Sequence, residues 1–387
     1  MTTDIRRFGY IDSLRAIAIL GVIAVHTASK TLVGDLDRVW QVIRQICIFG
    51  GFGVPLFYAV SAFTIVMLYN KRYKNENHYI ASFYTRRLMR IAPVYWGGIL
   101  LYTAIFGFTG GRGWQEAPEA WHYLLHATFL NMTTPMTAST VVPGGWSISN
   151  EVMFYIIFPA LFLCVRNLKG AVLFMGATIA LSPVFLSIAE WLVATVFSEA
   201  PAKYSEQFLY RWLPNHLTSF AAGFVAYYAL ADREAIRAFI TKRKVAATLI
   251  AGAYLGLIGA FFLLGDRFPA ALKNQKFALL LVPTFVAFGI YQWRTLDNAL
   301  FHFIGRISFS CYILHFLAIT TFDALVPADL SAPVRFIAVG SLTLVATFTA
   351  AALAYRYWEQ TFVKLTPAAV TAVRRVLSRD RNATQAA

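Results

Sequence analysis

The sequence contains little charge: only 14% of its 387 residues are Asp, Glu, Lys or Arg, whereas 58% are hydrophobic. Soluble domains carry roughly a quarter charged residues, so this composition excludes that class and predicts an integral membrane protein. Cysteine is also scarce. Cys47, Cys164 and Cys311 lie in apolar stretches and lack the CxxC spacing of metal or redox motifs, so we expect them to be packing residues.

Acidic residues are few as well, 19 against 34 Lys and Arg, which gives a formal net charge of +15. Such an excess is typical of nucleic-acid-binding proteins, but here the basic residues lie in short loops between apolar segments. In that position they set membrane topology and meet anionic lipid. We therefore expect membrane lipids as partners and no nucleic acid.

Apolar segments long enough to cross a bilayer follow one another along the chain. The expected fold is all-α, a polytopic helical bundle with about ten transmembrane helices. The predicted spans are 11–33, 46–69, 91–109, 146–165, 170–197, 208–230, 245–265, 277–293, 303–322 and 334–357. The apolar segment 120–130 is too short to cross, and an interfacial or re-entrant helix is expected there.

Ten spans place both termini on one side, and the loop charges indicate which side. Most of the 34 Lys and Arg residues fall inside if the N-terminus is cytoplasmic, as the positive-inside rule requires. We expect no cleavable signal, no internal repeat and no appended soluble domain. Residues 1–365 are then one transmembrane domain, and 366–387 form a basic tail that is disordered or lies on lipid.

The first span carries two polar residues where polarity is costly. Arg15 and His26 are eleven residues apart, nearly a whole number of helical turns, so they share one face about 16 Å apart along the axis. One interpretation is structural, with Arg15 reaching the headgroups and His26 bonding a neighbouring helix. The other is functional, because a fixed cation and a titratable imidazole at two depths suit a reaction site. The second span opens with Gly50, Gly51, Gly53 and Pro55, which predicts a broken helix start and close backbone approach.

Arg87 and Arg90 are one helical turn apart at the start of the third span. They fit a basic cluster that fixes topology. They also fit a phosphate site, because guanidinium groups bind phosphate through two hydrogen bonds.

Glu151 lies about one turn inside the fourth span, in the depth range expected for His26. A carboxylate there needs a partner, and an imidazole would serve. Trp146 fits an interfacial anchor or a surface for sugar. His122 and His126 share a helix face, but no carboxylate or cysteine nearby completes a metal set, so no metal site is expected.

In the ninth span, Tyr312 and His315 lie deeper than Arg306. Because nine residues separate Arg306 from His315, the two do not share a face, and His315 is expected to line a pocket or make a structural hydrogen bond. Glu359 closes the last span next to Arg356, which predicts an ion pair between them.

Six stretches in order resemble the acyltransferase-3 family of bacterial integral-membrane acyltransferases, from about residue 8 to 365. They are SLRAIAILGVIAVH, GVPLFYAVSAF, RRLMRIAPVYW, WSISNEVMFY, GRISFSCYILHF and YRYWEQTF. The chain departs from the family pattern at Ala62, where the family often has Gly, and at Val152, where it often has a second acid. The fused extracellular hydrolase-like domain of some relatives is not among the matched stretches.

The resemblance implies an O-acyltransferase of the bacterial inner membrane. It would move an acyl group, usually acetyl, from acyl-CoA to a hydroxyl of a cell-surface or exported carbohydrate or a glycosylated metabolite. His26 would be the catalytic base, and Arg15, Arg87 and Arg90 would serve the acyl-CoA. From the residues themselves, Glu151 would orient the imidazole or hold the acceptor, and Trp146, Tyr312 and His315 would contact the acceptor. Direct transfer and an acyl-histidine intermediate both stay open.

A transporter or flippase is the alternative, because intramembrane Arg, His and Glu also form relays and substrate paths. Transporters are often built from repeated halves with paired broken helices, and the two halves of this chain do not correspond in that way. Hydrolysis or binding of acyl-CoA by the purified protein separates the two classes.

Overall fold

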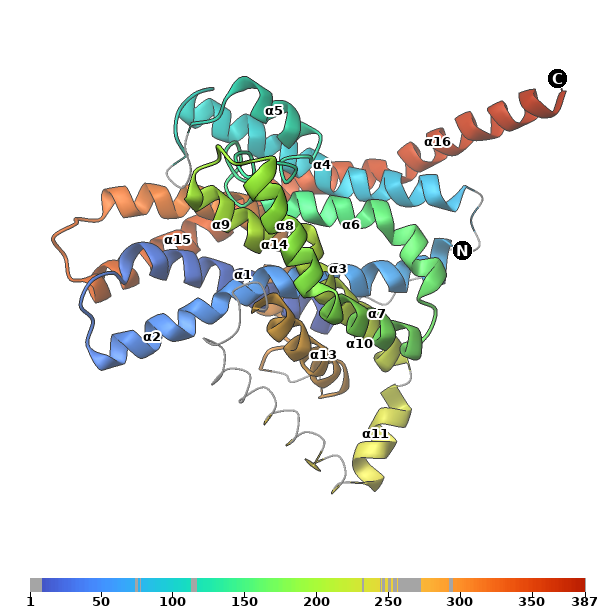
Figure 1. Ribbon diagram of the computed structural model, residues 1–387, viewed down its shortest axis with the longest axis horizontal. Coiled ribbons are helices and arrows are strands. Elements are labelled where there is room, and N and C mark those ends of the chain that lie inside the picture. The colour runs from blue at the N-terminus through green and yellow to red at the C-terminus, as the bar shows by residue number, and fades with distance from the viewer. Residues whose placement is uncertain are drawn as a thin grey trace. The chain divides into compact units, whose positions relative to one another are not determined.

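The computed structural model describes residues 9–73, 76, 78–112, 117–231, 233–243, 273–291 and 295–386, with scattered positions between 245 and 256. All the regular secondary structure in these residues is helical (Figure 1). The α-helices are α1 Gly9–Thr31, α2 Arg38–Ile48, α3 Gly53–Leu68, α4 Tyr79–Phe106, α5 Ala120–Ala127, α6 Gly145–Cys164, α7 Leu168–Ala180, α8 Ser182–Thr195, α9 Ala202–Arg211, α10 Leu217–Ala231, α11 Arg233–Lys242, α13 Lys273–Tyr291, α14 Ala299–Leu325, α15 Ala332–Ala354 and α16 Gln360–Ala386. Two π-helical turns, Tyr69–Tyr73 and Tyr355–Glu359, follow α3 and α15.

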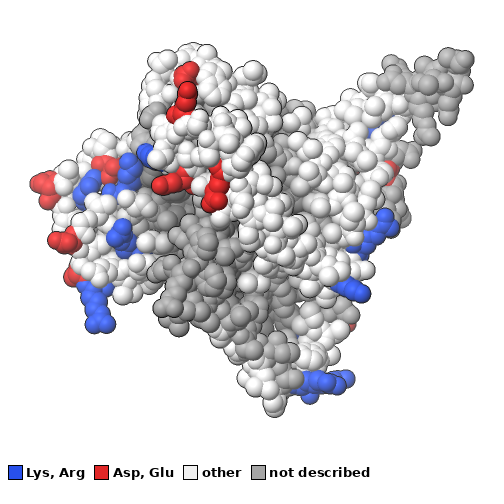
Figure 2. Space-filling model, in the orientation of Figure 1, with Lys and Arg blue, Asp and Glu red and all other residues white. Residues whose placement is uncertain are grey.

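Within the described residues, six helical segments are long and apolar enough to cross a membrane, or seven if the bent pair α7 and α8 forms one span. The prediction of an all-α, multi-pass membrane bundle is confirmed. Figure 2 shows a face on which most side chains carry no charge. The number ten is not reached, because α10 has only 15 residues and the apolar part of α13 is Phe277–Tyr291. The predicted span 245–265 lies outside the described ranges.

The chain forms two compact units, and each is made of several stretches. The first unit contains Met1–Val22, Gly50–Thr64 and Phe162–Arg306, and the second contains Ile23–Phe49, Ile65–Leu161 and Ile307–Ala387.

In the first unit, small residues let helix backbones meet. A Cβ atom on Gly50 would overlap the carbonyl of Gly21, and one on Gly53 would overlap the carbonyl of Ala18. The start of α3 therefore lies directly against α1, and a 3₁₀ turn at Phe49–Phe52 precedes it. This confirms the broken helix start and the close approach predicted from the glycines. α10 packs on α7 and α13 in the same unit.

In the second unit, hydrogen bonds from tyrosine side chains tie α4 to its neighbours. Tyr84 donates to the carbonyl of Ile156 on α6 at 2.9 Å, and Tyr102 donates to the carbonyl of Ile313 on α14 at 3.0 Å. The Tyr102 phenol is buried, so its bond removes the cost of leaving that hydroxyl unpaired. The short segment around 120–130 forms helix α5, as the sequence predicts.

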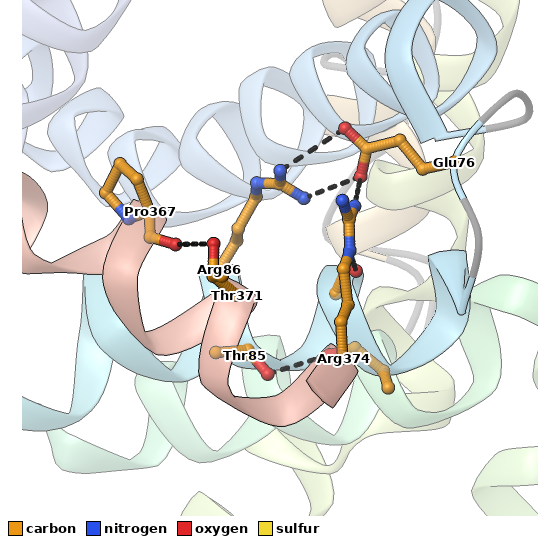
Figure 3. Close-up of polar contacts among 8 residues, drawn as sticks. Glu76, Thr85, Arg86, Pro367, Thr371 and Arg374 are labelled. Carbon is orange, nitrogen blue, oxygen red and sulfur yellow. Dashed lines mark hydrogen bonds and ion pairs between the residues drawn. The ribbon is translucent and has the colours of Figure 1, made fainter. Parts of the chain in front are cut away.

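The segment after Thr366, expected as a disordered or lipid-bound tail, is helical and forms the last part of α16, which packs on α4. Glu76 holds the two helices together. Its carboxylate accepts hydrogen bonds from Arg86 on α4 at 3.1 and 3.3 Å and pairs with Arg374 on α16 (Figure 3). Arg374 Nε also donates to the Ser82 hydroxyl at 2.8 Å. One carboxylate thus pairs with two arginines at this junction, and the three groups together keep a net positive charge.

Candidate active site

Two histidines from distant parts of the sequence meet in the second unit. His26 near the end of α1 and His315 on α14 have ring centroids 5.5 Å apart, and the Phe316 ring lies 4.5 Å from His26. His26 is partly buried, whereas His315 is 0% exposed. The structure therefore brings the predicted base together with a residue predicted to line the acceptor site.

The hydrogen bonds of His315 define its tautomer. Its Nδ1 lies 2.8 Å from the carbonyl oxygen of Tyr312, one turn earlier on α14. A carbonyl can only accept, so Nδ1 carries the hydrogen and Nε2 presents a lone pair. Within the described chain this buried Nε2 has no hydrogen-bond partner. It is a hydrogen-bond acceptor available to a ligand next to His26.

A hydroxyl network continues from Tyr312 to the start of α6. The Ser147 hydroxyl lies 2.7 Å from the Tyr312 hydroxyl, which donates to the carbonyl of Gly144 at 3.1 Å. Gly144 has φ +79°, and a Cβ atom there would come within 3.1 Å of that phenol. Trp146, in the first turn of α6, is buried rather than exposed as an interfacial anchor would be. All three substrate-contact candidates, Trp146 on α6 and Tyr312 and His315 on α14, thus lie inside the protein.

Glu151 is partly buried on α6 and accepts a hydrogen bond from the Tyr155 hydroxyl one turn further on. The Arg87 guanidinium lies 5.6 Å from the Tyr155 ring. Glu151 and Arg87 are thereby linked through one tyrosine. The predicted pairing of Glu151 with His26 stays a prediction.

Arg87 and Arg90 both project from α4, as predicted. Arg90 forms an ion pair with Glu359, with 2.6 Å between Nη1 and Oε1, and its side chain is 39% exposed. The Arg87 guanidinium contacts the rings of Phe83 and Tyr155, and its buried Nε has no partner in the part of the chain that the structure describes. Both arginines keep donor capacity for an anionic group.

The predicted ion pair between Glu359 and Arg356 is wrong. Glu359 is 1% exposed and bonds Arg90 and the Ser310 hydroxyl, 3.0 Å from its second oxygen, while the Arg356 guanidinium lies over the Tyr357 ring. The cause is the π-helical turn Tyr355–Glu359, since π turns rotate side chains away from α-helical positions. Glu359 and Ser310 are site neighbours that sequence reasoning missed. The only signal was an acid at the end of an apolar span.

Arg15 lies in the first unit. Its Nη1 is 3.2 Å from the Asp12 carboxylate one turn earlier, and its Nη2 donates to the Thr64 hydroxyl at 3.4 Å. Asp12 is 3% exposed at its side chain, so this ion pair is largely shielded. Helix α1 is uninterrupted from Gly9 to Thr31 and carries both Arg15 and His26, as predicted.

Outside the spans, α5 is fixed by two buried histidines. His126 accepts from the Tyr95 hydroxyl at Nδ1, 2.7 Å away, and donates from Nε2 to the carbonyl of Thr137 at 2.8 Å. Burial lowers the pKa of His126 to about 3 and also lowers the pKa of His122. Neutral His126 is therefore a structural link, and no group of three potential metal ligands occurs among the described residues.

Comparison with known proteins adds an independent finding. The acyltransferase domain family matches residues 8–354. Acyltransferase MdmB of Streptomyces mycarofaciens is 25% identical over 333 residues, which cover 82% of this chain and 81% of that protein. A Staphylococcus aureus strain COL protein assigned as an O-acetyltransferase is 24% identical over 94% of this chain, but the chain spans only 59% of its length.

The peptidoglycan O-acetyltransferase OatA of Listeria monocytogenes is 28% identical over 165 residues, 40% of this chain and 24% of that protein. No solved structure shows a significant match.

Proposed function

The chain belongs to the acyltransferase domain family, and from that premise we propose that it transfers an acyl group, in the first instance acetyl, from acyl-CoA to a carbohydrate hydroxyl. The observation that carries the proposal is the contact between His26 and His315 inside a family match that spans most of the chain. A pair of imidazoles within a membrane helix bundle is costly unless it is used.

His26 is the proposed general base. A sugar hydroxyl is a weak nucleophile at neutral pH, and an imidazole that takes its proton supplies about 10² to 10⁴ in rate. The hydroxyl oxygen bonds to the thioester carbonyl carbon, and the carbon–sulfur bond breaks. The proton held by the imidazole then passes to the departing CoA thiolate, so the cycle needs no other reactant.

Arg87, Arg90 and Arg15 are the proposed contacts of the acyl-CoA phosphates. Arg90 supports this because it is 39% exposed, so its guanidinium keeps hydrogens for an incoming phosphate while Glu359 holds it in place. Arg87 supports it through its buried Nε, which has no partner among the described residues. Arg15 rests on the family resemblance and on its place on α1, the helix of His26.

The acceptor side is proposed to involve Trp146, Tyr312 and His315, with Glu151 orienting the base or the acceptor. His315 Nε2 accepts hydrogen bonds and the Tyr312–Ser147 pair offers hydroxyls, a set suited to a polyhydroxylated ligand. The names of the relatives point the same way, since one is a peptidoglycan O-acetyltransferase. A cell-surface or exported carbohydrate is therefore the acceptor class we propose.

The proposed location is the bacterial inner membrane, with both termini in the cytoplasm where acyl-CoA is made. The support is the excess of basic residues in loops assigned to that side.

The test is acyl transfer by the purified protein. Incubation with acetyl-CoA labelled in the acetyl group should release free CoA and, with the correct acceptor, move label to carbohydrate. The acceptor can be found by comparing the surface polysaccharides of the host with and without the gene. A wild-type protein that neither binds nor cleaves acetyl-CoA would favour transport instead, because a flippase has no use for CoA.

A further inference from the structure

Three buried threonine hydroxyls in the second unit have no function in the reaction as proposed so far. Thr27 on α1 and Thr343 and Thr347 on α15 are at most 1% exposed, and within the described chain their Oγ1 atoms have no hydrogen-bond partner. Several other threonines in helices satisfy their hydroxyls locally; Thr103, for example, donates to the carbonyl of Ile99 at 2.7 Å. The buried Thr218 hydroxyl on α10, in the first unit, also lacks a partner among the described residues. An unpaired buried hydroxyl is costly, so three together require an explanation.

Two contacts of α15 locate these hydroxyls relative to the histidines. Thr27 follows His26 in the chain, and its methyl group would lie 3.6 Å from a Cβ on Gly340. Next to the loop that joins α14 to α15, Arg335 on α15 pairs with Asp323 on α14 at 2.7 Å. The two helices run antiparallel from this loop. Eight residues away from the ion pair, α15 carries Thr343 and α14 carries His315, so Thr343 is level with the histidine pair.

One more turn along α15 brings Thr347 level with Cys311, the neighbour of Ser310. The Ser310 hydroxyl bonds Glu359, the partner of Arg90. Thr347 and Thr343 are therefore ordered between the proposed phosphate contact and the proposed base. The two lie on one face of α15, about 6 Å apart along its axis, and α15 buries that face.

We propose that Thr343 and Thr347 bind the two amide groups of the phosphopantetheine arm of the acyl donor. This inference rests on the proposed function. The arm joins the CoA phosphates to the thioester and carries two amides separated by two methylene groups. A hydroxyl can donate to an amide carbonyl or accept from an amide N–H, and the spacing of one helical turn suits consecutive amides. Both hydroxyls are at most 1% exposed, so binding of the arm requires the side chains above them to move.

The experiment uses the full-length protein in detergent and compares two probes. CoA contains the arm, whereas adenosine 3′,5′-bisphosphate contains phosphates without it. Thr343→Val and Thr347→Val remove a hydroxyl at nearly constant volume. Each should weaken CoA binding by about 3- to 10-fold, the effect of one lost hydrogen bond, and leave the dissociation constant of the bisphosphate unchanged. Thr→Ser at either site keeps the hydroxyl and should retain most of the CoA affinity.

Thr103→Val is the matched control, because its hydroxyl is bonded within α4; CoA binding should not change. The thermal midpoint of the two α15 variants should be unchanged or raised, since their hydroxyls have no partner to lose. Unchanged CoA affinity in the Thr343→Val/Thr347→Val double variant overturns the inference, as does equal weakening of both probes or a lowered midpoint. These results leave the proposed acyl-CoA donor intact if the wild type binds CoA. A wild type that binds neither probe overturns the donor itself.

Discussion

The imidazole rings of His26 and His315 lie 5.5 Å apart between centroids, although 289 positions separate them in the chain. His315 is held by the carbonyl of Tyr312 so that its Nε2 can only accept. His26 is the more accessible of the two. The contact therefore places the proposed base beside an oriented hydrogen-bond acceptor.

The first prediction concerns His26. His26→Ala should reduce acyl transfer by about 10² to 10⁴, the usual contribution of a general base, while the protein still inserts and folds. Glu151→Gln should be impaired less if Glu151 only orients the base. The measurement is labelled acetyl transfer, with size-exclusion chromatography to verify folding. A folded His26→Ala protein with most of its activity removes His26 from the base role, and equal complete loss in both variants indicates a dyad acting as one unit.

The second prediction concerns the donor phosphates. Arg87→Ala and Arg90→Ala should each raise the Michaelis constant for acyl-CoA about 10-fold or more, because a hydrogen bond to a charged group contributes about 1.5–3 kcal/mol. Lys at either position should restore only part of the acyl-CoA affinity, since it cannot form the bidentate hydrogen bonds of Arg. Arg86→Gln is the matched control, as Arg86 is adjacent but bound to Glu76. Unchanged acyl-CoA dependence in a correctly inserted Arg87→Ala/Arg90→Ala protein would return both residues to a topological role.

The third prediction concerns the ion pair of Arg90 with Glu359. Arg90→Ala leaves a carboxylate that is 1% exposed without its cation, which should destabilise the protein by about 1–3 kcal/mol. Adding Glu359→Gln removes the charge and keeps an acceptor for Ser310, so the double variant should be more stable than Arg90→Ala alone. Thermal unfolding midpoints measure this coupling. Additive effects of the two substitutions would show that the pair does not matter for folding.

Much of the fold follows from local patterns. Apolar length places α1, α6 and α14 close to the predicted spans, whereas α4 begins at Tyr79 and not near residue 91. The glycines of the second span predict a close backbone approach to a neighbour or ligand, and the structure shows that the neighbour is α1. Short helices are harder to predict from apolar length. For example, α10 has 15 residues because the 3₁₀ turn at Leu213–His216 interrupts the apolar run. Hydropathy averages over such a break.

The site was only partly predictable. The spacing of Arg87 and Arg90 follows from one helix, and so does that of Arg15 and His26. The partners of Glu359 come from α4 and α14, and its direction depends on a π turn that no sequence period reveals. The contact of His26 with His315 likewise depends on how α1 packs on α14. Contacts between helices distant in sequence require the structure.

The fourth prediction concerns acid sensitivity at α5. Burial lowers the pKa of His126 to about 3, below the ordinary value near 6.5. The unfolded chain therefore binds the proton first, and the stability that neutral His126 contributes is present above about pH 6.5 and is lost as the pH falls toward 3, by up to about 1.4 kcal/mol per pH unit. His126→Gln, which cannot titrate, should flatten the fall of the unfolding midpoint between pH 7 and 5. His122→Gln should have a smaller effect. Equal slopes in wild type and His126→Gln would assign the acid sensitivity to other groups.

The last prediction concerns sidedness. If the loop charges give the orientation, Arg87 and Arg90 open to the cytoplasm and His26 lies toward the other face. Donor and acceptor would then enter one continuous path from opposite sides, since CoA is confined to the cytoplasm. In vesicles with the protein in one orientation, acyl-CoA supplied only on the cytoplasmic side should acylate an acceptor held on the other side. Arg87→Ala/Arg90→Ala should abolish this response at low acyl-CoA and recover at high concentration, whereas His26→Ala should not recover, because one change weakens binding and the other removes the base. Transfer that requires both substrates on one side would refute the trans-membrane mechanism while leaving the enzyme class intact.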